Sequence, residues 1–307
     1  MGQRIRALRG LRHLRGLVQE NARLKAELAQ YERGWPPGHF YSPIPSIEEV
    51  RRREDVIFGA PPRGVPGVDL NEGGQLRLLD AIAPYYAEQP FKPQKSRNLR
   101  YCFENPNYTY GEALVLYCMI RHLRPRNIVE IGSGYSSCVI LDTNDLFFEG
   151  SIDCTFIEPH PELLLSLIDG GRTAHARTID RKLEDVPHEL FSSLQEGDML
   201  FVDSTHVAKV GSDVNRIFAQ LLPGVSPGVY VHFHDVYYPF EYPKKWIYEG
   251  RAWNEAYVLR SFLQFNRAFE IAFFNSFMAQ FHEARLRELM PLYMTVPGSS
   301  IWLRRVR

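Results

Sequence analysis

The stretch that decides the fold is NIVEIGSGYSSCVILDTN, residues 127–144. An apolar run ends at Glu130 and breaks into Gly132 and Gly134, after which apolar residues recur at helical spacing. Glycine permits a positive φ and a close approach of the backbone to a ligand, and the free N–H groups at a helix start favour a negative group. The turn is therefore either a ligand site or an ordinary strand-to-helix connection, and this stretch alone does not separate the two.

Short strand and helix patterns alternate from about residue 98 to the C-terminus. Helical spacing is found over 110–125, 136–147, 161–169, 187–195, 212–224 and 253–265. Strands are predicted over 127–132, 153–159, 174–180, 198–204, 228–235, 269–275 and 299–306. This order predicts an α/β fold with a doubly wound, mostly parallel seven-stranded sheet of the Rossmann-like kind, with the active site at the carboxyl ends of the strands.

The first part of the chain has a different pattern. We predict a helix over residues 1–35, an irregular N-terminal arm over 36–97 and the α/β domain over 98–307. The helix carries about three heptads of a coiled coil, and a polar a position suits a parallel dimer. The a positions are Leu14, Asn21 and Leu28, and the d positions are Leu17, Leu24 and Tyr31. Packing of the helix on its own domain is the alternative, and the arginines of residues 4–15 are interpreted as a solvated face.

Composition limits the class of partner. The chain has 307 residues, 45% of them hydrophobic, with 36 basic and 36 acidic residues, so no net charge attracts nucleic acid or acidic lipid. The four cysteines, Cys102, Cys118, Cys138 and Cys154, form no CxxC pair and are interpreted as reduced. There is no signal-peptide pattern and no apolar run of roughly 18 to 20 residues. We therefore expect a cytoplasmic protein without a membrane span, acting on a small molecule or another protein.

Acids follow the first two predicted strands of the α/β domain. The spacing around Gly132 is E-x-G-x-G-x-S, with Ser136 where the GxGxxG of dinucleotide binders has its third glycine. The second strand ends at Glu158, where a carboxylate can bind both hydroxyls of a ribose. This combination suits a nucleoside that bears an amino acid better than a diphosphate.

With VEIGSGYSS, FIEP and LFVDSTH in place, the chain resembles the class I S-adenosylmethionine-dependent methyltransferases. It is similar to their small-molecule O-methyltransferase branch, in which the fourth strand ends in D-x-x-H and the fifth in H-D. The resemblance covers residues from about 98 to the C-terminus, and it implies cofactor-binding roles for Tyr110, Glu130, Gly132, Ser133, Gly134, Tyr135, Ser136, Glu158 and Asp203. The family's usual G-D-A is absent near the expected adenine site, which leaves open whether Arg181, Lys182 or Leu183 faces the ring.

Catalytic candidates follow the fourth and fifth strands. Methyl transfer requires an oxygen held close to the methyl carbon and removal of its proton. A histidine with a pKa near neutrality can take the proton, and His206 and His234 are the candidates, beside Asp203. In the alternative, Asp203 and Asp235 hold Mg²⁺, which lowers the hydroxyl pKa. The resemblance counts against that metal, because Val236 stands where the catechol O-methyltransferase type has Asn.

The segment 236–257, VYYPFEYPKKWIYEGRAWNEAY, is rich in aromatic residues and is interpreted as a substrate lid. The function expected is transfer of a methyl group from S-adenosylmethionine to a hydroxyl of a sugar or specialised metabolite, with homo-oligomerisation through the N-terminal helix as a further expectation. Two alternatives remain: a nicotinamide-dependent oxidoreductase, and a non-catalytic nucleoside-binding assembly protein.

Overall fold

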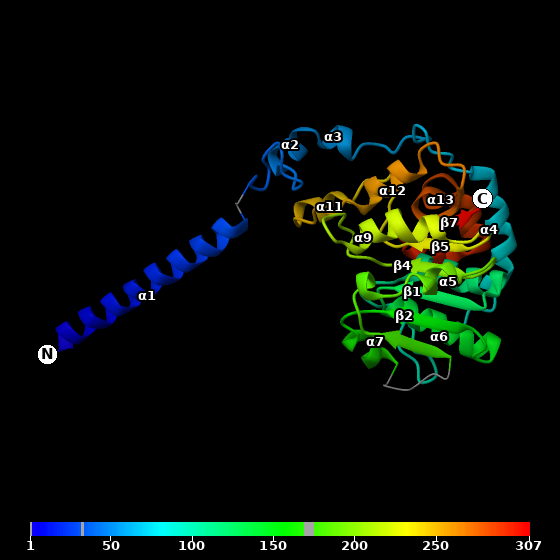
Figure 1. The fold of residues 1–307 in the computed structure, drawn as a ribbon, viewed down its shortest axis with the longest axis horizontal. Helices are drawn as coiled ribbons and strands as arrows, with labels where there is room; N and C mark the ends of the chain where they lie inside the picture. Colours follow the sequence, from blue (N-terminus) through cyan, green and yellow to red (C-terminus); the bar gives the residue numbers. More distant parts are fainter. Residues whose placement is uncertain (1, 32–33, 169–174) are drawn as a thin grey trace. The chain divides into compact units, whose positions relative to one another are not determined.

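The computed structural model describes residues 2–31, 34–168 and 175–307. The chain divides into two compact units (Figure 1). One unit comprises Met1–Gly59 with Tyr248–Ala252, and the other comprises Ala60–Ile247 with Trp253–Arg307.

The larger unit is built on a seven-stranded sheet in the order β3-β2-β1-β4-β5-β7-β6. The strands are β1 (Asn127–Ile131), β2 (Asp153–Ile157), β3 (Ala176–Ile179), β4 (Met199–Val202), β5 (Tyr230–Phe233), β6 (Phe269–Phe274) and β7 (Ile301–Arg305). The first five strands pair in parallel, and β7 is antiparallel to both β5 and β6. The predicted sheet is confirmed, strand by strand.

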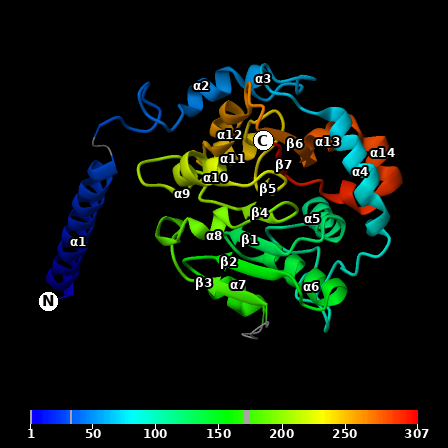
Figure 2. The same cartoon turned by 45° about the vertical axis from the view of Figure 1, so that its right-hand side comes forward.

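Helices cover both faces of this sheet (Figure 2). In Figure 2, α4 (Glu72–Tyr86), α5 (Tyr110–Leu123) and α6 (Tyr135–Phe148) lie on one side, and α8 (Glu189–Ser192), α9 (Asp213–Arg216) and α10 (Leu222–Gly224) on the other. The remaining α-helices are α7 (Glu162–Leu167), α11 (Lys244–Tyr248), α12 (Glu255–Leu263), α13 (Asn275–Phe281) and α14 (Glu283–Leu289). Two short 3₁₀ helices, η1 (Leu183–Asp185) and η3 (Pro291–Thr295), and a π-helical segment, η2 (Ile217–Leu221), complete the unit.

The central strands are mostly apolar because both of their faces are covered, with Glu130 of β1 and His232 of β5 as buried polar exceptions. Ile128 and Val129 of β1 are buried, as are all four residues of β4. The register aligns Ile131 with Ile157 of β2 and with Val202 of β4, so these three strands end at the same edge. The turns that follow them therefore meet in space.

The larger unit begins before the predicted domain boundary at residue 98. Helix α4 lies inside the segment predicted as an irregular arm, and its Leu79 and Ile82 are fully buried. Gly73, Gly74 and Pro84 conceal its helical pattern in the sequence, because glycine and proline are poor helix formers. Tertiary packing outweighs that local preference, so residues 60–97 belong to the compact unit that holds the sheet.

Helices α13 and α14, which were not predicted, follow β6. Helix α14 lies beside α4 (Figure 2), where Arg285 pairs with Asp80 at 2.8 Å and His282 Nε2 lies 2.7 Å from Glu72 Oε1. These contacts join segments that are far apart in the sequence. A residue pattern read locally does not contain them.

The smaller unit contains α1 (Gly2–Tyr31), α2 (Ile47–Arg52) and α3 (Glu54–Ile57). Ser46 caps α2 by accepting a hydrogen bond from the Glu49 N–H, and Val50 is buried. Tyr248 donates a hydrogen bond to Glu54, which ties residues 248–252 to this unit. The side chains of residues 2–12, 30 and 31, including Tyr31 and the arginines up to Arg12, lie outside the described residues.

Within the described part of the chain, no helix combines the length and the apolar character needed to cross a membrane. All four cysteines are free, and Cys118, Cys138 and Cys154 are buried. The cytoplasmic location stays a prediction.

Candidate functional site

Gly132 and Gly134, which look equivalent in the sequence, have different conformations. Gly132 has φ +77°, and a Cβ added there would lie 2.0 Å from the backbone oxygen of Asp203. Gly134 has an extended φ of 179°, and a Cβ there would meet only a Leu163 methyl at 3.6 Å, an ordinary contact. Contacts within the protein therefore explain why residue 132 is glycine. They give no reason why residue 134 is glycine.

Glu130 lies beneath this turn and is fully buried. Its carboxyl accepts hydrogen bonds from the Ser136 hydroxyl, at 2.5 Å, and from the Ser137 hydroxyl, while Ser137 Oγ accepts the Gly134 N–H at 3.0 Å. Burial raises the pKa of Glu130 to about 8, although the two hydroxyls act to lower it. Glu130 thus holds the turn in place through the two serine hydroxyls. Ser136, at the position of the third glycine of GxGxxG, has a side chain that takes part in these contacts.

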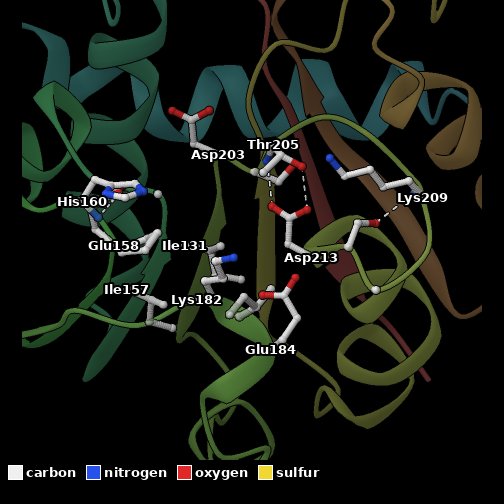
Figure 3. Close-up of a pocket in the computed structure, with 16 residues that line it drawn as sticks. Ile131, Ile157, Glu158, His160, Lys182, Glu184, Asp203, Thr205, Lys209 and Asp213 are labelled. Carbon is white, nitrogen blue, oxygen red and sulfur yellow. Dashed lines mark hydrogen bonds between the residues drawn. The ribbon is translucent and has the colours of Figure 1, made fainter. Parts of the chain in front are cut away.

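A cavity of about 440 Å³ opens at the carboxyl ends of β1, β2 and β4 (Figure 3). Gly132, Glu158 and Asp203 are among the residues that line it. Glu158 accepts hydrogen bonds from the Ser133 N–H at 3.2 Å and the His160 N–H at 2.8 Å. A carboxylate has about four acceptor positions, so two remain for a ligand.

The cavity also bears on the question left open at Arg181, Lys182 and Leu183. Lys182 and Leu183 line it, whereas Arg181 is not among its lining residues. Leu183 is 4% exposed and provides an apolar part of the lining, and Asp213, also a lining residue, accepts hydrogen bonds from Thr205. The geometry favours Leu183, with the stem of Lys182, as the contact for a flat ring.

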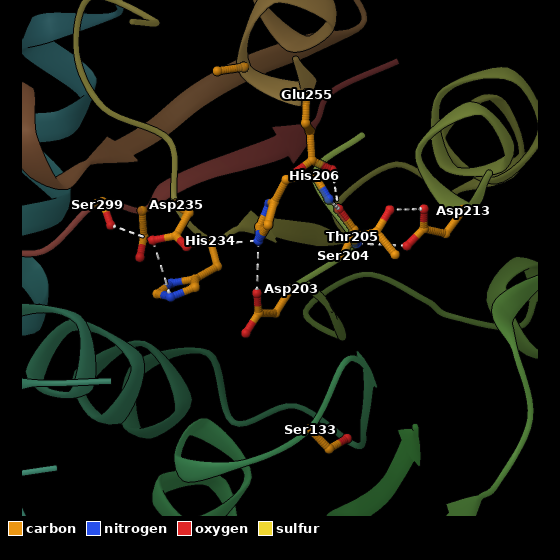
Figure 4. Close-up of polar contacts among 12 residues, drawn as sticks. Ser133, Asp203, Ser204, Thr205, His206, Asp213, His234, Asp235, Glu255 and Ser299 are labelled. Atoms are coloured by element: carbon orange, nitrogen blue, oxygen red, sulfur yellow. Dashed lines mark hydrogen bonds and ion pairs between the residues drawn. The ribbon is translucent and has the colours of Figure 1, made fainter. Parts of the chain in front are cut away.

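His206 lies among three carboxylates at the end of β4 (Figure 4). Its Nδ1 is 2.8 Å from Glu255 Oε2, and its Nε2 is 3.3 Å from Asp203 Oδ1 and 3.8 Å from Asp235 Oδ2. Burial alone would lower the pKa of His206, but the hydrogen bonds to Asp203 and Glu255 raise it to about 10. The imidazole therefore carries a proton on both nitrogens at neutral pH.

Asp203 is the member of this group that faces the cavity, with 38% of its side-chain surface exposed. Burial raises the pKa of its carboxyl, but the charge of His234 and the hydrogen bond from His206 outweigh that effect, so the pKa lies below its ordinary value. Asp203 is thus an ionised carboxylate held beside a buried cation.

His234 lies on the other side of the group, with Nδ1 3.0 Å from Glu112 Oε1 and Nε2 3.5 Å from Asp235 Oδ1. Burial would lower the pKa of His234, yet the charges of Glu112, Asp235 and Asp203 raise it well above its ordinary value. Glu112 is itself held by the Ser300 hydroxyl at 2.7 Å and by the Ser299 N–H at 3.1 Å.

Strand alternation would put Asp235 on the opposite face from the histidines. The strand ends at Phe233, however, and Asp235 adopts φ +56°, which brings its carboxylate to His234 and to the Ser299 hydroxyl at 3.0 Å. His232 is a core residue, fully buried and stacked on Phe201 at 3.8 Å. Burial lowers its pKa well below the ordinary value, so His232 is neutral.

Among the remaining candidates, Tyr110 begins α5 and stacks on Phe103 at 4.6 Å, and Tyr135 begins α6 and is half-buried. Neither lines the cavity. Ser133 contributes a buried hydroxyl that has no hydrogen-bond partner among the described residues.

Part of the aromatic segment 236–257 packs over His206. The Trp253 ring lies 4.3 Å from the His206 ring, and Trp246 and Tyr242 contact Trp253 at 5.3 and 6.0 Å. The segment contains the short helix α11, and its role as a substrate lid stays a prediction.

The sequence analysis missed two carboxylates of this site. Glu112 is in the third position of the motif YGEALVL, and Glu255 begins α12 after a tryptophan and an asparagine. Each is an acid within a segment of otherwise apolar helical pattern, which is the one signal that could have found them, because a buried acid needs a partner.

The proposed Mg²⁺ ligands do not form a metal site. Asp203 and Asp235 both face Nε2 of His206, so the imidazole fills the position that a shared ion would need. Among the described residues, no group of three or more His, Cys, Asp or Glu side chains could hold a metal ion. The expectation of a metal at Asp203 and Asp235 therefore finds no support.

Comparison with known proteins adds the following. Residues 129–236 match a family described as a methyltransferase domain. An uncharacterized protein of Archaeoglobus fulgidus is 40% identical over 166 residues, which is 53% of this chain and 74% of that protein.

Solved structures with a similar fold include the SAH-bound methyltransferase PaMTH1 of Podospora anserina, at 14% identity and TM-score 0.42, with 85% of this chain and 97% of that chain covered. The O-methyltransferase TomG of Streptomyces achromogenes, involved in tomaymycin synthesis and in complex with SAM, has 16% identity and TM-score 0.42, with 78% and 92% covered. At these identities and TM-scores, the two likenesses support no inference about the reaction.

Proposed function

The chain belongs to the same family as the Archaeoglobus fulgidus protein and is an S-adenosylmethionine-dependent methyltransferase, and from this premise we propose that it methylates a hydroxyl oxygen of a small molecule. The observation that carries the proposal is the position of Asp203, whose carboxylate lines the cavity and at the same time contacts His206.

The residues around the cavity fit S-adenosylmethionine. Glu158 has free acceptor positions for the two ribose hydroxyls, and Leu183 offers an apolar wall for the adenine. Ser133 and Gly134 follow the lining residue Gly132 without lining the cavity themselves; Gly134 has room for a side chain, and the Ser133 hydroxyl lacks a partner that a polar ligand group would supply. When bound, this cofactor supplies a methyl group on a sulfonium.

Three further residues would act on the cofactor side indirectly. Both Glu130 oxygens accept serine hydroxyls, so Glu130 would orient the methionine amino group through Ser136 and the turn above it. Tyr110 and Tyr135 begin the two helices next to this turn, and we assign them to closing the methionine end.

Asp203 would bind and orient the acceptor hydroxyl, and would take its proton only as the oxygen becomes methylated, because a carboxylate with a lowered pKa is too weak a base for a free hydroxyl. Both ring nitrogens of His206 face carboxylates, so His206 acts as a donor that holds Asp203 in place and balances its charge. His234 lies at ion-pair distance from Glu112 and Asp235. This assignment replaces the histidine base expected from the sequence with a carboxylate supported by histidine, and it needs no metal ligand.

The acceptor itself would lie under the aromatic segment. Trp253 and Tyr242 form the side of that segment next to His206. Flat aromatic faces pack against a sugar ring or a planar acceptor, and the charged group beneath recognises its hydroxyl. We therefore propose a small hydroxylated acceptor.

The test is methyl transfer from labelled S-adenosylmethionine to a panel of hydroxylated sugars and phenols, with the parent chain and Asp203→Asn. We expect kcat/KM to fall on the order of 100- to 10,000-fold in Asp203→Asn, with the affinity for S-adenosylhomocysteine changed little. The exposed Asp185→Asn serves as the matched control.

Two outcomes would contradict the proposal. Activity of Asp203→Asn equal to that of the parent would remove Asp203 from the proton transfer. Loss of parent activity in EDTA, restored by Mg²⁺, would bring back the metal alternative.

Titration with a nicotinamide dinucleotide tests the oxidoreductase alternative. Tight binding of the dinucleotide, without binding of S-adenosylmethionine, would support that alternative.

A further inference from the structure

Within the smaller unit, helix α1 carries a stripe of large apolar side chains that the rest of the unit leaves exposed. The exposed fractions are 58% for Leu14, 54% for Leu17, 66% for Val18, 51% for Leu24 and 58% for Leu28. Apolar surface arranged along one side of a long helix is normally covered by another element or another chain.

Contacts within α1 give the helix little stability. Arg23 pairs with Glu20 at 2.7 Å and with Glu27 at 3.7 Å, and each such pair contributes about 0.2–0.5 kcal/mol. Gly16, in the helix interior, costs roughly 1 kcal/mol relative to alanine. Most helical stability in proteins comes from packing of an apolar face, so α1 needs a partner on its stripe.

The spacing of the stripe identifies the kind of partner. Leu14, Asn21 and Leu28 occupy a positions, and Leu17 and Leu24 occupy the d positions between them. We propose that α1 of a second copy of this chain covers the stripe in a parallel, in-register, two-stranded coiled coil. An asparagine at an a position favours this arrangement, because it pairs with the same asparagine across a parallel dimer.

Charges beside the stripe select the same orientation. Glu20 and Glu27 occupy g positions and Lys25 an e position. In a parallel pair, each g residue faces the e residue of the next heptad, so Glu20 meets Lys25 of the partner subunit. In an antiparallel pair, g residues face one another, and glutamates would meet glutamates. At Glu20 the parallel pairing thus gives attraction and the antiparallel one repulsion, whereas Glu27 falls opposite Glu32 of the partner subunit by the same spacing.

The first test measures the mass of the full chain by sedimentation equilibrium over a range of concentrations. The parent is expected to be a dimer, and Leu17→Glu/Leu24→Glu to raise the dimer dissociation constant about 100-fold or more. Gln19→Glu/Ala26→Glu, at the solvent-facing f positions, is the matched control and keeps the parent mass. Because all four side chains are exposed on α1, circular dichroism should show that the sheet-containing unit stays folded in every variant.

Charge reversal separates contacts between chains from contacts within one helix. Glu20→Lys and Lys25→Glu are each expected to weaken the dimer, and the double variant Glu20→Lys/Lys25→Glu is expected to restore it. The pair between Glu20 and Arg23 within one helix is lost in the single and in the double variant alike, so it cannot account for the restoration. A double variant as weak as Glu20→Lys alone would overturn the parallel pairing.

Disulfide trapping determines the orientation. In a Cys102→Ser background, Leu17→Cys (a d position) and Leu28→Cys (an a position) chains are mixed and oxidised. A parallel, in-register pair gives disulfides between like chains, whereas an antiparallel pair gives disulfides between unlike chains. A parent chain that is monomeric at all concentrations, or that binds phosphatidylserine vesicles through the same leucines instead, would overturn the proposal.

Discussion

The two edges of the cavity are built in different ways. At the ends of β1 and β2, Glu130, Ser136 and Ser137 lie within seven positions of one another, and the backbone supplies most of the remaining contacts. At the ends of β4 and β5, by contrast, His206 meets Glu255 across 49 positions and Asp235 meets Ser299 across 64. The first edge is a local motif, and the second is assembled by the fold.

This difference corresponds to the division of work that we propose. The cofactor edge repeats one geometry, a strand, a tight turn and a helix start, which a short sequence can specify. The acceptor edge concentrates two buried cations among four carboxylates, and such groups are stable only when the fold brings partners to each of them. We expect the glycine substitutions at the first edge to act through the backbone, and the carboxylate substitutions at both edges to act through charge.

Gly132→Ala should have the largest effect on stability. It places a Cβ against the Asp203 carbonyl in a left-handed conformation, and we expect a loss of about 3 kcal/mol in the free energy of unfolding. Urea denaturation followed by fluorescence measures this loss. A loss below about 1 kcal/mol would mean that the two edges do not meet at this backbone contact.

Glu255→Gln should come next, with a loss of about 2–3 kcal/mol near pH 7, because it breaks a buried pair. The folded-state pKa of His206, about 10, lies above its unfolded value, so its stabilisation is complete below pH 6.5 or so and is lost as the pH rises through 10.

NMR titration of the His206 ring should therefore show a pKa closer to the ordinary range in Glu255→Gln, and the fall in stability above pH 7 should become smaller. Glu288→Gln, in an exposed ion pair with Arg285, is the matched control and should change stability by less than about 1 kcal/mol. An unchanged His206 pKa in Glu255→Gln would show that Glu255 does not determine the protonation of His206.

Glu130→Gln should have an intermediate effect that depends on pH. The folded-state pKa of Glu130, about 8, lies above its unfolded value, so the parent loses stability as the pH rises from about 4 through 8. The glutamine variant should lack this loss, on the order of 1–3 kcal/mol, while the exposed Glu189→Gln keeps the parent profile. Urea midpoints measured between pH 5 and 9 provide the comparison, and identical profiles for parent and Glu130→Gln would contradict the burial of an ionisable carboxyl there.

Gly134→Ala should have the smallest effect on stability, below about 1 kcal/mol, because a Cβ fits there without a clash. Under the proposed function it should nevertheless weaken S-adenosylmethionine binding about 10-fold or more, since Gly134 belongs to the turn that we assign to the methionine end. Isothermal titration calorimetry measures the affinity. Unchanged affinity would show that the second glycine is not kept for the cofactor.

Much of the fold could be predicted from the sequence because its signals are local. The strand that ends at Glu130 and the turn through Gly132 follow from apolar runs and glycines, and all seven strands were found in this way. The smaller helices after β6 and helix α4 were not, since Pro84 and the paired glycines of α4 oppose the helical pattern that its buried Leu79 enforces.

The candidate site divides in the same manner. The sequence by itself determined that acids and histidines end successive strands, because parallel strands bring their carboxyl ends to one edge. Only the tertiary structure decided that Glu255 and Glu112 reach His206 and His234, that His232 is a core residue, and that Asp203 alone of the four carboxylates around these histidines opens to the cavity. The physical reason is that protonation and burial depend on partners brought together by folding, and the spacing of residues along a strand does not encode those partners.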